Sequence, residues 1–155
     1  MKTPNHVKLF DFDGTLAYYE KWKGKYVLGI PIQNIIDKVK YYLSEGYTCK
    51  IFTARDFTDL QVKDLIEQWC QNHIGQILEI TNIKDFKVHQ IFDDRANKVI
   101  KNTGITETEL LEKLMSCFSI MDNGNLEWKY IEGYGLNYCL GKELTEILKN
   151  NYKKI

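Results

Sequence analysis

The chain has 155 residues, which is enough for one domain with a sizeable hydrophobic core. Acidic and basic residues balance at 21 each, and this balance excludes an overall basic field that would gather nucleic acid. The sequence shows no apolar run of about 18 residues and no charged-then-apolar leader, and its four cysteines lack metal-site spacing. We therefore expect a cytoplasmic protein without membrane association, with reduced thiols and with Cys49 and Cys70 in the core.

Strands and helices are predicted to alternate up to residue 92. The predicted elements are a strand from Val7, a loop or short hairpin over 17–29, a helix over 31–46, a strand over 47–52, a helix over about 58–73, and strands over 77–80 and 88–92. The buried side of the second helix is predicted to carry Leu60, Leu65, Ile66, Trp69 and Cys70. This alternation predicts a parallel sheet covered by helices, with right-handed crossovers.

The last third of the chain has weaker patterns. Apolar spacing predicts a helix over Glu107–Phe118 and a terminal helix over Lys142–Tyr152. Between them, the turn sequence 122–125 (Asp-Asn-Gly-Asn) predicts a hairpin within residues 119–131. We expect a single domain over 1–155, with a core over 6–105 and a C-terminal hairpin-plus-helix extension over 106–155.

Polar side chains follow three of the predicted strands. Asp11 and Asp13 end the first strand, Thr53 follows the second, and the adjacent pair Asp93 and Asp94 follows the last. Carboxyl ends of parallel strands meet at one edge of a sheet, where ligands bind. Two carboxylates in contact there repel by about 4 kcal/mol, and a divalent cation relieves the repulsion. The competing interpretation is that such aspartates only cap turns or helices.

These residue types fit the hydrolysis of a phosphate monoester. Asp11 is the candidate nucleophile, which would form an aspartyl-phosphate, and Asp13 is the candidate acid and base. The Thr53 hydroxyl and the backbone N–H groups just after it, beginning at Ala54, would donate hydrogen bonds to phosphoryl oxygens. Hard oxygen ligands suit Mg²⁺, so Asp93 and Asp94 would complete a magnesium site with Asp11.

Three motifs and one lysine together resemble the haloacid dehalogenase-like (HAD) superfamily. They are DFDGTL at 11–16, FTAR at 52–55 and FDDR at 92–95, with the lysine at 84 or 87. The resemblance covers roughly residues 7–95. It implies a Rossmann-like three-layer sandwich with a mostly parallel central sheet, and Mg²⁺-dependent phosphoryl transfer. It also implies that Asp13 lends its backbone carbonyl to the metal. An acid at position 13 favours the phosphatase-type members over dehalogenases.

The phosphate-binding lysine has two candidates. We prefer Lys84, because similar short phosphatase-like proteins have a Thr-Asn-x-Lys stretch, and residues 81–84 match it. Lys87 is the alternative. Members of this family often carry a cap domain over the active site, inserted either just after the first strand or between the threonine and lysine motifs. The short spacings at both positions here leave no room for a large cap domain. The chain therefore resembles the capless members, whose open sites often serve macromolecular substrates or are closed by a partner subunit.

The substrate class stays open among a nucleotide, another small phosphometabolite and a polynucleotide phosphate end, and so does a homo-oligomeric state. The loop from Tyr18 to Tyr26, with Trp22, would act as a small lid or a stacking surface for a base; alternatively, its aromatic rings pack on the body of the protein. Arg55 and Arg95 would contact substrate phosphate or form structural ion pairs.

His6, His73 and His89 share no ligand spacing, so we interpret them as structural. Two non-enzymatic alternatives compete with the hydrolase. A phospho-regulatory receiver domain uses similar residues, but its acid pair comes first in the chain and its phosphorylated aspartate later, the reverse of the order found here. A non-catalytic binding module is disfavoured because every required side chain is present.

Overall fold

The computed structural model describes residues 6–115, 118–120 and 126–128, and the side chains of residues 6–112. The chain divides into two compact units, residues 1–96 and 97–155. The expectation of a single domain with its boundary near residue 105 stays a prediction. None of the helices in the described part of the chain is long and apolar enough to cross a membrane.

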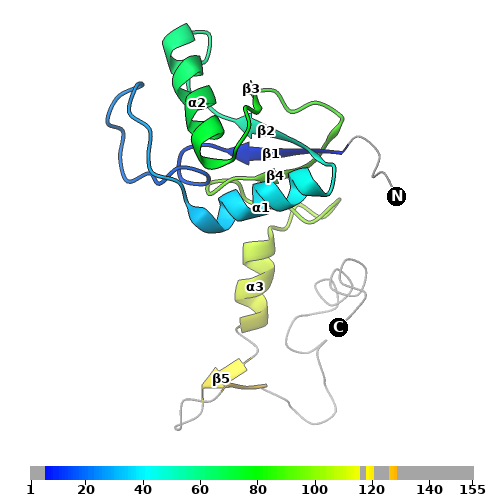
Figure 1. The fold of residues 1–155 in the computed structure, drawn as a ribbon. Coiled ribbons are helices and arrows are strands. Elements are labelled where there is room, and N and C mark those ends of the chain that lie inside the picture. Colours follow the sequence, from blue (N-terminus) through cyan, green and yellow to red (C-terminus); the bar gives the residue numbers. More distant parts are fainter. Residues whose placement is uncertain (1–5, 116–117, 121–125, 129–155) are drawn as a thin grey trace. The chain divides into compact units, whose positions relative to one another are not determined.

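The first unit contains a parallel sheet of four strands (Figure 1). The strands are β1 (Val7–Asp11), β2 (Thr48–Phe52), β3 (Glu79–Thr81) and β4 (Val88–Phe92), in the spatial order β3-β2-β1-β4. Asp11 pairs with Phe52, and Phe52 pairs with Thr81, so these strands end level with one another. This confirms the predicted parallel α/β sheet, and it brings the polar residues that follow each strand to one edge.

Two helices cover the sheet, α1 (Gln33–Ser44) and α2 (Leu60–His73). One hydrophobic cluster contains Phe10 and Ile51 from the sheet together with Val39 from α1 and Ile66 from α2, so both helices pack on the same face. This is the geometry that two successive right-handed crossovers in one direction produce. The buried thiols of Cys49 and Cys70 belong to the same cluster, as predicted.

Of the predicted core residues of α2, Leu60 is wrong and Leu65 is only partly buried. Leu60 is 73% exposed, whereas Val62, which the prediction omitted, is fully buried. The side chain of Asp59 accepts a hydrogen bond from the Gln61 N–H and fixes the start of α2 at Leu60. Leu60 then lies about 200° around the helix from Val62, because each residue turns an α-helix by about 100°. It therefore faces solvent.

Neither position at which a cap would be inserted holds a further domain in the described residues. The segment between β1 and α1 is a loop, and α2 is the only helix between β2 and β3. In Figure 1 the loop between β1 and α1, in blue, projects beyond the carboxyl ends of the strands. The predicted absence of a large cap therefore agrees with the structure of this unit.

The second unit contains α3 (Glu107–Met115) and an antiparallel pair, β5 (Phe118–Ile120) with β6 (Leu126–Trp128). The predicted hairpin is confirmed by this pairing. The predicted helix runs too far, because Phe118 pairs with Trp128 in the hairpin instead of continuing α3. The turn at 122–125 and the predicted helix over Lys142–Tyr152 lie outside the described residues.

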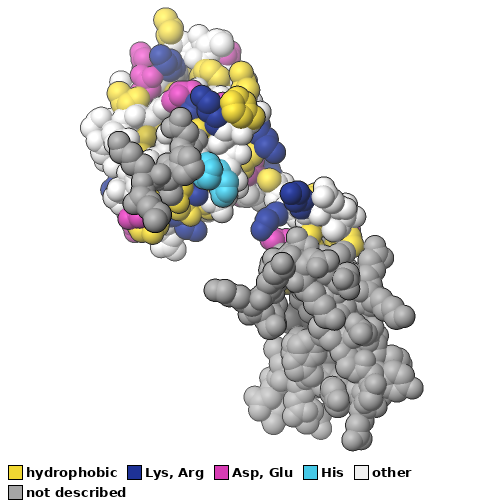
Figure 2. Space-filling view, turned by 90° about the vertical axis from the view of Figure 1, so that its right-hand side faces the viewer, with side chains coloured by type: hydrophobic (Ala, Val, Ile, Leu, Met, Phe, Trp, Pro, Cys, Tyr) yellow, Lys and Arg dark blue, Asp and Glu magenta, His cyan; other side chains and the backbone are white. Residues whose placement is uncertain are grey.

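The histidines pack against other rings. His6 stacks on His89 with ring centroids 4.5 Å apart, and His73 packs edge-on against Trp69 at 4.8 Å. On the face drawn in Figure 2, Lys and Arg side chains are spread among Asp and Glu rather than gathered into one basic patch. These observations agree with structural histidines and with the balanced charge of the chain.

Candidate active site

The turn that follows β1 depends on Gly14. Its φ angle is +96°, in the left-handed region that favours glycine. A Cβ at this position would lie only 2.7 Å from Oδ2 of Asp94, so a side chain would collide with that carboxylate. The Asp94 N–H also donates a hydrogen bond of 3.1 Å to the Thr15 hydroxyl. The first and last motifs of the sequence therefore meet at this turn.

Three carboxylates converge beside the turn. One oxygen from each of Asp11, Asp93 and Asp94 lies within 4.8 Å of the others. Asp93 is oriented by the Arg95 N–H, which donates to its Oδ1 at 2.8 Å. The convergence of these three residues, which the sequence predicted, is present in the structure. Three acids at this separation form a group that could hold a cation.

Asp11 has the most unusual environment of the three. Its side chain is 6% exposed, and its Oδ2 atom is buried with no hydrogen-bond partner among the described residues. Burial first, and then the nearby charge of Asp93, raise the pKa of Asp11 to about 7, whereas the Phe12 N–H opposes the shift. An unpartnered buried carboxylate oxygen is costly unless a cation or a proton satisfies it. This atom is the observation that distinguishes the triad from an ordinary exposed acidic cluster.

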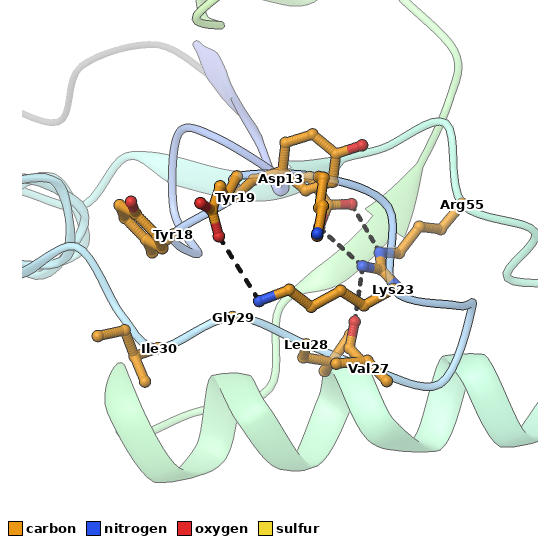
Figure 3. Close-up of a pocket in the computed structure, with 11 residues that line it drawn as sticks. Asp13, Tyr18, Tyr19, Lys23, Val27, Leu28, Gly29, Ile30 and Arg55 are labelled. Atoms are coloured by element: carbon orange, nitrogen blue, oxygen red, sulfur yellow. Dashed lines mark hydrogen bonds and ion pairs between the residues drawn. The ribbon is translucent and has the colours of Figure 1, made fainter.

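Asp13 does not join this triad and is paired with Arg55 instead (Figure 3). The guanidinium donates from Nε to Oδ2 at 2.6 Å and from Nη2 to Oδ1 at 2.8 Å, a bidentate pair. The Arg55 side chain is only 4% exposed and the Asp13 side chain 17%. Of the two roles left open for Arg55, the structure contains the ion pair.

Arg55 also ties down the loop over the site. Its Nη1 donates to the Lys25 carbonyl at 2.7 Å, and its Nη2 donates to the Val27 carbonyl at 2.9 Å. At the base of the loop, the Tyr18 N–H donates to the Ile30 carbonyl at 2.7 Å. One buried side chain therefore fixes both the Asp13 carboxylate and the path of this loop.

The aromatic side chains of the loop are partly exposed and partly packed on the body of the protein, where the Tyr26 hydroxyl donates to Asp59 at 3.1 Å, so both interpretations of the loop stay predictions. Tyr18, Tyr19, Trp22 and Tyr26 are exposed by 59%, 42%, 58% and 43%. Arg55 partly explains the position of Trp22, because its guanidinium carbon lies 5.2 Å from the centre of the indole ring. These rings are available to a ligand.

Thr53 lies where the sequence predicts, at the carboxyl end of β2. The residue is buried, and its N–H donates to the Thr81 carbonyl at 3.1 Å. Its hydroxyl oxygen accepts from the Arg55 N–H at 3.1 Å, which leaves the hydroxyl proton free to be donated. Ala54, the next residue, is exposed and lines a cavity beside Asp13.

The two lysine candidates follow or precede strands at opposite edges of the sheet. The Lys87 carbonyl accepts from the Val7 N–H at 3.1 Å, which places this residue at the amino edge of the sheet, opposite the aspartates. Lys84 is exposed and follows the carboxyl end of β3 by three positions. Neither lysine lines the cavities beside Asp13, so the role of Lys84 stays a prediction, favoured over that of Lys87.

Two cavities flank Asp13 and Arg55. The larger, about 480 Å³, is lined by Asp13, Asp94, Ala54, Trp22 and Arg95 among others. The smaller, about 310 Å³, lies along the inside of the loop (Figure 3). Sequence reasoning did not identify the part of Lys25 in this site, since its role comes from the backbone carbonyl that binds Arg55 and no side-chain pattern reveals it.

A scan against protein-family models found no match to this chain, and searches of the curated proteins and of the solved structures found none. The function must therefore be inferred from the residues of the site and their geometry.

Proposed function

We propose that this chain is a cytoplasmic Mg²⁺-dependent phosphatase of the HAD type, with a Rossmann-like fold, which hydrolyses a phosphate monoester through an aspartyl-phosphate on Asp11. The single observation that carries the proposal is the buried, unpartnered Oδ2 of Asp11 beside Asp93 and Asp94. A carboxylate kept free of protein partners at a ligand-binding edge of a parallel sheet is suited to act as a nucleophile and a metal ligand.

The residues present fit a magnesium ion. Carboxylate oxygens of Asp11, Asp93 and Asp94 would hold it, together with the backbone carbonyl of Asp13, and oxygen ligands are those that Mg²⁺ prefers. When bound, the ion would neutralise phosphoryl charge and orient the ester. Its positive charge would also favour the ionised form of Asp11, the form that a nucleophile requires.

Two displacements at phosphorus make up the proposed reaction. In the first, a carboxylate oxygen of Asp11 forms a bond to phosphorus while the bond to the ester oxygen breaks, and a protonated Asp13, released from one of its two contacts with Arg55, gives its proton to that oxygen. In the second, water attacks phosphorus, Asp13 takes a proton from the water, and Asp11 leaves as a free carboxylate. The contacts with Arg55 keep the Asp13 carboxyl group oriented beside the cavity.

Three further groups would bind the phosphoryl oxygens. The Thr53 hydroxyl still has a proton to donate, and the Ala54 N–H lies next to it at the end of β2. Lys84 would supply the positive charge that balances the remaining phosphoryl charge. The main alternative is a non-catalytic binding or phospho-regulatory module, which would use the same groups to hold a phosphate without cleaving it.

The test is release of phosphate from a generic aryl phosphate, with and without Mg²⁺, by the wild type and by Asp11→Asn. Asp64→Asn, an exposed carboxylate on α2, is the matched control. We expect release that requires Mg²⁺, that Asp64→Asn retains, and that Asp11→Asn loses by at least about 10³-fold. An inactive wild type across a broad panel of esters would favour the binding module, and full activity in Asp11→Asn would refute the mechanism.

A further inference from the structure

We infer that the substrate is a nucleoside monophosphate, whose base stacks on Trp22 while its phosphate reaches Asp11. This inference rests on the proposed function and names the substrate class of the same site. It depends on one juxtaposition: the exposed indole ring of Trp22 lines the same cavity as Asp13, the proposed acid and base, and Asp94, a neighbour of Asp11 in the acidic triad.

The larger cavity is lined by two chemically different groups of residues. Asp13 and Asp94 belong to the proposed site at the strand ends, and Tyr19 and Trp22 belong to the loop. Its volume of about 480 Å³ falls within the usual range for small-molecule sites, about 300–1,000 Å³. A molecule that fills it would therefore contact both carboxylates and aromatic rings.

Trp22 contacts a fixed side chain and is still largely exposed. The Arg55 guanidinium carbon lies 5.2 Å from the indole centre, and Arg55 itself is fixed by Asp13 and two loop carbonyls. More than half of the Trp22 side chain nevertheless remains exposed, at 58%. A ring fixed in this way stacks on a planar base with little further loss of conformational freedom.

One cation at this cavity remains available to the ligand. Arg95 is exposed, and its guanidinium has no hydrogen bond or ion pair with any described residue. Lys25 and Arg55, which also line the cavity, are already paired with Asp59 and Asp13. Arg95 can therefore contact the phosphate or a ribose hydroxyl.

A mononucleotide explains these features better than the other substrates left open. An aliphatic phosphate ester would leave the indole exposed to water. A polynucleotide needs a track of free cations along its backbone, whereas two of the three lysines of the loop, Lys23 and Lys25, are paired with Glu20 and Asp59. A single phosphate with an attached base matches one free cation and one stacking ring.

The experiment compares Mg²⁺-dependent phosphate release from adenosine 3′- and 5′-monophosphate with release from ribose 5-phosphate. The wild type should prefer at least one nucleotide in kcat/KM by 10-fold or more, as an order of magnitude for base stacking. Trp22→Ala should lower kcat/KM for that nucleotide by about 10- to 100-fold and change it for ribose 5-phosphate by less than about 3-fold. Trp22→Phe should retain most of the preference.

Tyr41→Ala is the matched control, because Tyr41 on α1 is also a 58% exposed aromatic residue and lines neither cavity. It should leave both substrates unchanged. Equal hydrolysis of nucleotide and sugar phosphate, or an equal loss on both in Trp22→Ala, would overturn the stacking inference and leave the phosphatase standing. Preference for a 3′-phosphorylated oligonucleotide over the mononucleotides would also overturn it. No release from any ester would overturn the proposed function and this inference with it.

Discussion

Replacing Asp11 with Asn should stabilise the metal-free protein. The pKa of Asp11 is raised in the folded state from 3.8 to about 7, first by burial and then by Asp93. Between these two pH values the folded protein keeps a proton that the unfolded chain has lost. The free energy of unfolding therefore falls as pH rises through this window, and an asparagine, which cannot ionise, escapes the penalty.

The size of the effect follows from the shift. One pKa unit corresponds to about 1.4 kcal/mol, so a shift from 3.8 to about 7 makes the ionised Asp11 cost about 4 kcal/mol at pH 8. The advantage of Asp11→Asn should shrink to about 2 kcal/mol at pH 5, where the native carboxyl is protonated and the unfolded one is mostly ionised. For a chain of this size, 4 kcal/mol corresponds to a rise in Tm of roughly 10 °C.

The assay is thermal or urea unfolding in a chelator from pH 4 to pH 8, repeated with Mg²⁺. With Mg²⁺ the wild type should gain stability, more at pH 8 than at pH 6, because a cation must displace the proton on Asp11. Asp64→Asn, the exposed control, should match the wild type throughout. An Asp11→Asn protein no more stable than the wild type at pH 8 without metal would refute the account of this carboxylate.

Three other changes have defined outcomes. Gly14→Ala should displace Asp94 and so weaken the stabilisation by Mg²⁺, measured as the shift in Tm on adding the ion. Gly24 has a similar positive φ of +110° but open space around it, so Gly24→Ala should cost stability without changing that shift. An equal Tm shift with Mg²⁺ in both variants would contradict the role of the contact between Gly14 and Asp94. Arg55→Gln should lower kcat/KM by about 10- to 100-fold and, because it removes the contacts to two loop carbonyls, increase cleavage of the loop in limited proteolysis. A variant with an uncut loop and full activity would contradict the proposal that Arg55 holds the loop in place. Lys84→Ala should raise KM for the ester in steady-state kinetics, whereas Lys87→Ala, at the amino edge of the sheet, should not. The reverse result would exchange the roles of the two lysines.

The sheet and the acidic triad could be predicted because both follow from short-range patterns. Apolar runs fix the strands, and parallel pairing with level ends brings Asp11 to the edge where Asp93 and Asp94 follow β4. Gly14 was recognisable as a turn residue, although its close approach to Asp94 depends on the meeting of distant segments.

Other features could not be predicted because they depend on the path of irregular chain. The tether from Arg55 uses backbone carbonyls of the loop, which have no signature in the side-chain pattern. Leu60 was misplaced because it is apolar but lies off the stripe formed by Val62, Ile66 and Trp69, which recur at helical spacing on the buried side of α2. Phe118 was also misplaced, since its pairing with Trp128 in the neighbouring strand β6 overrides the helical pattern of the residues before it.

Acid quenching of the protein during turnover with an aryl phosphate and Mg²⁺, followed by mass spectrometry of its peptides, would detect the aspartyl-phosphate itself. We expect a phosphoryl group on Asp11, absent without Mg²⁺ and absent in Asp11→Asn. A phosphoryl group on any other residue, or turnover without a trapped intermediate under conditions where phosphate release is slow, would contradict the proposed mechanism.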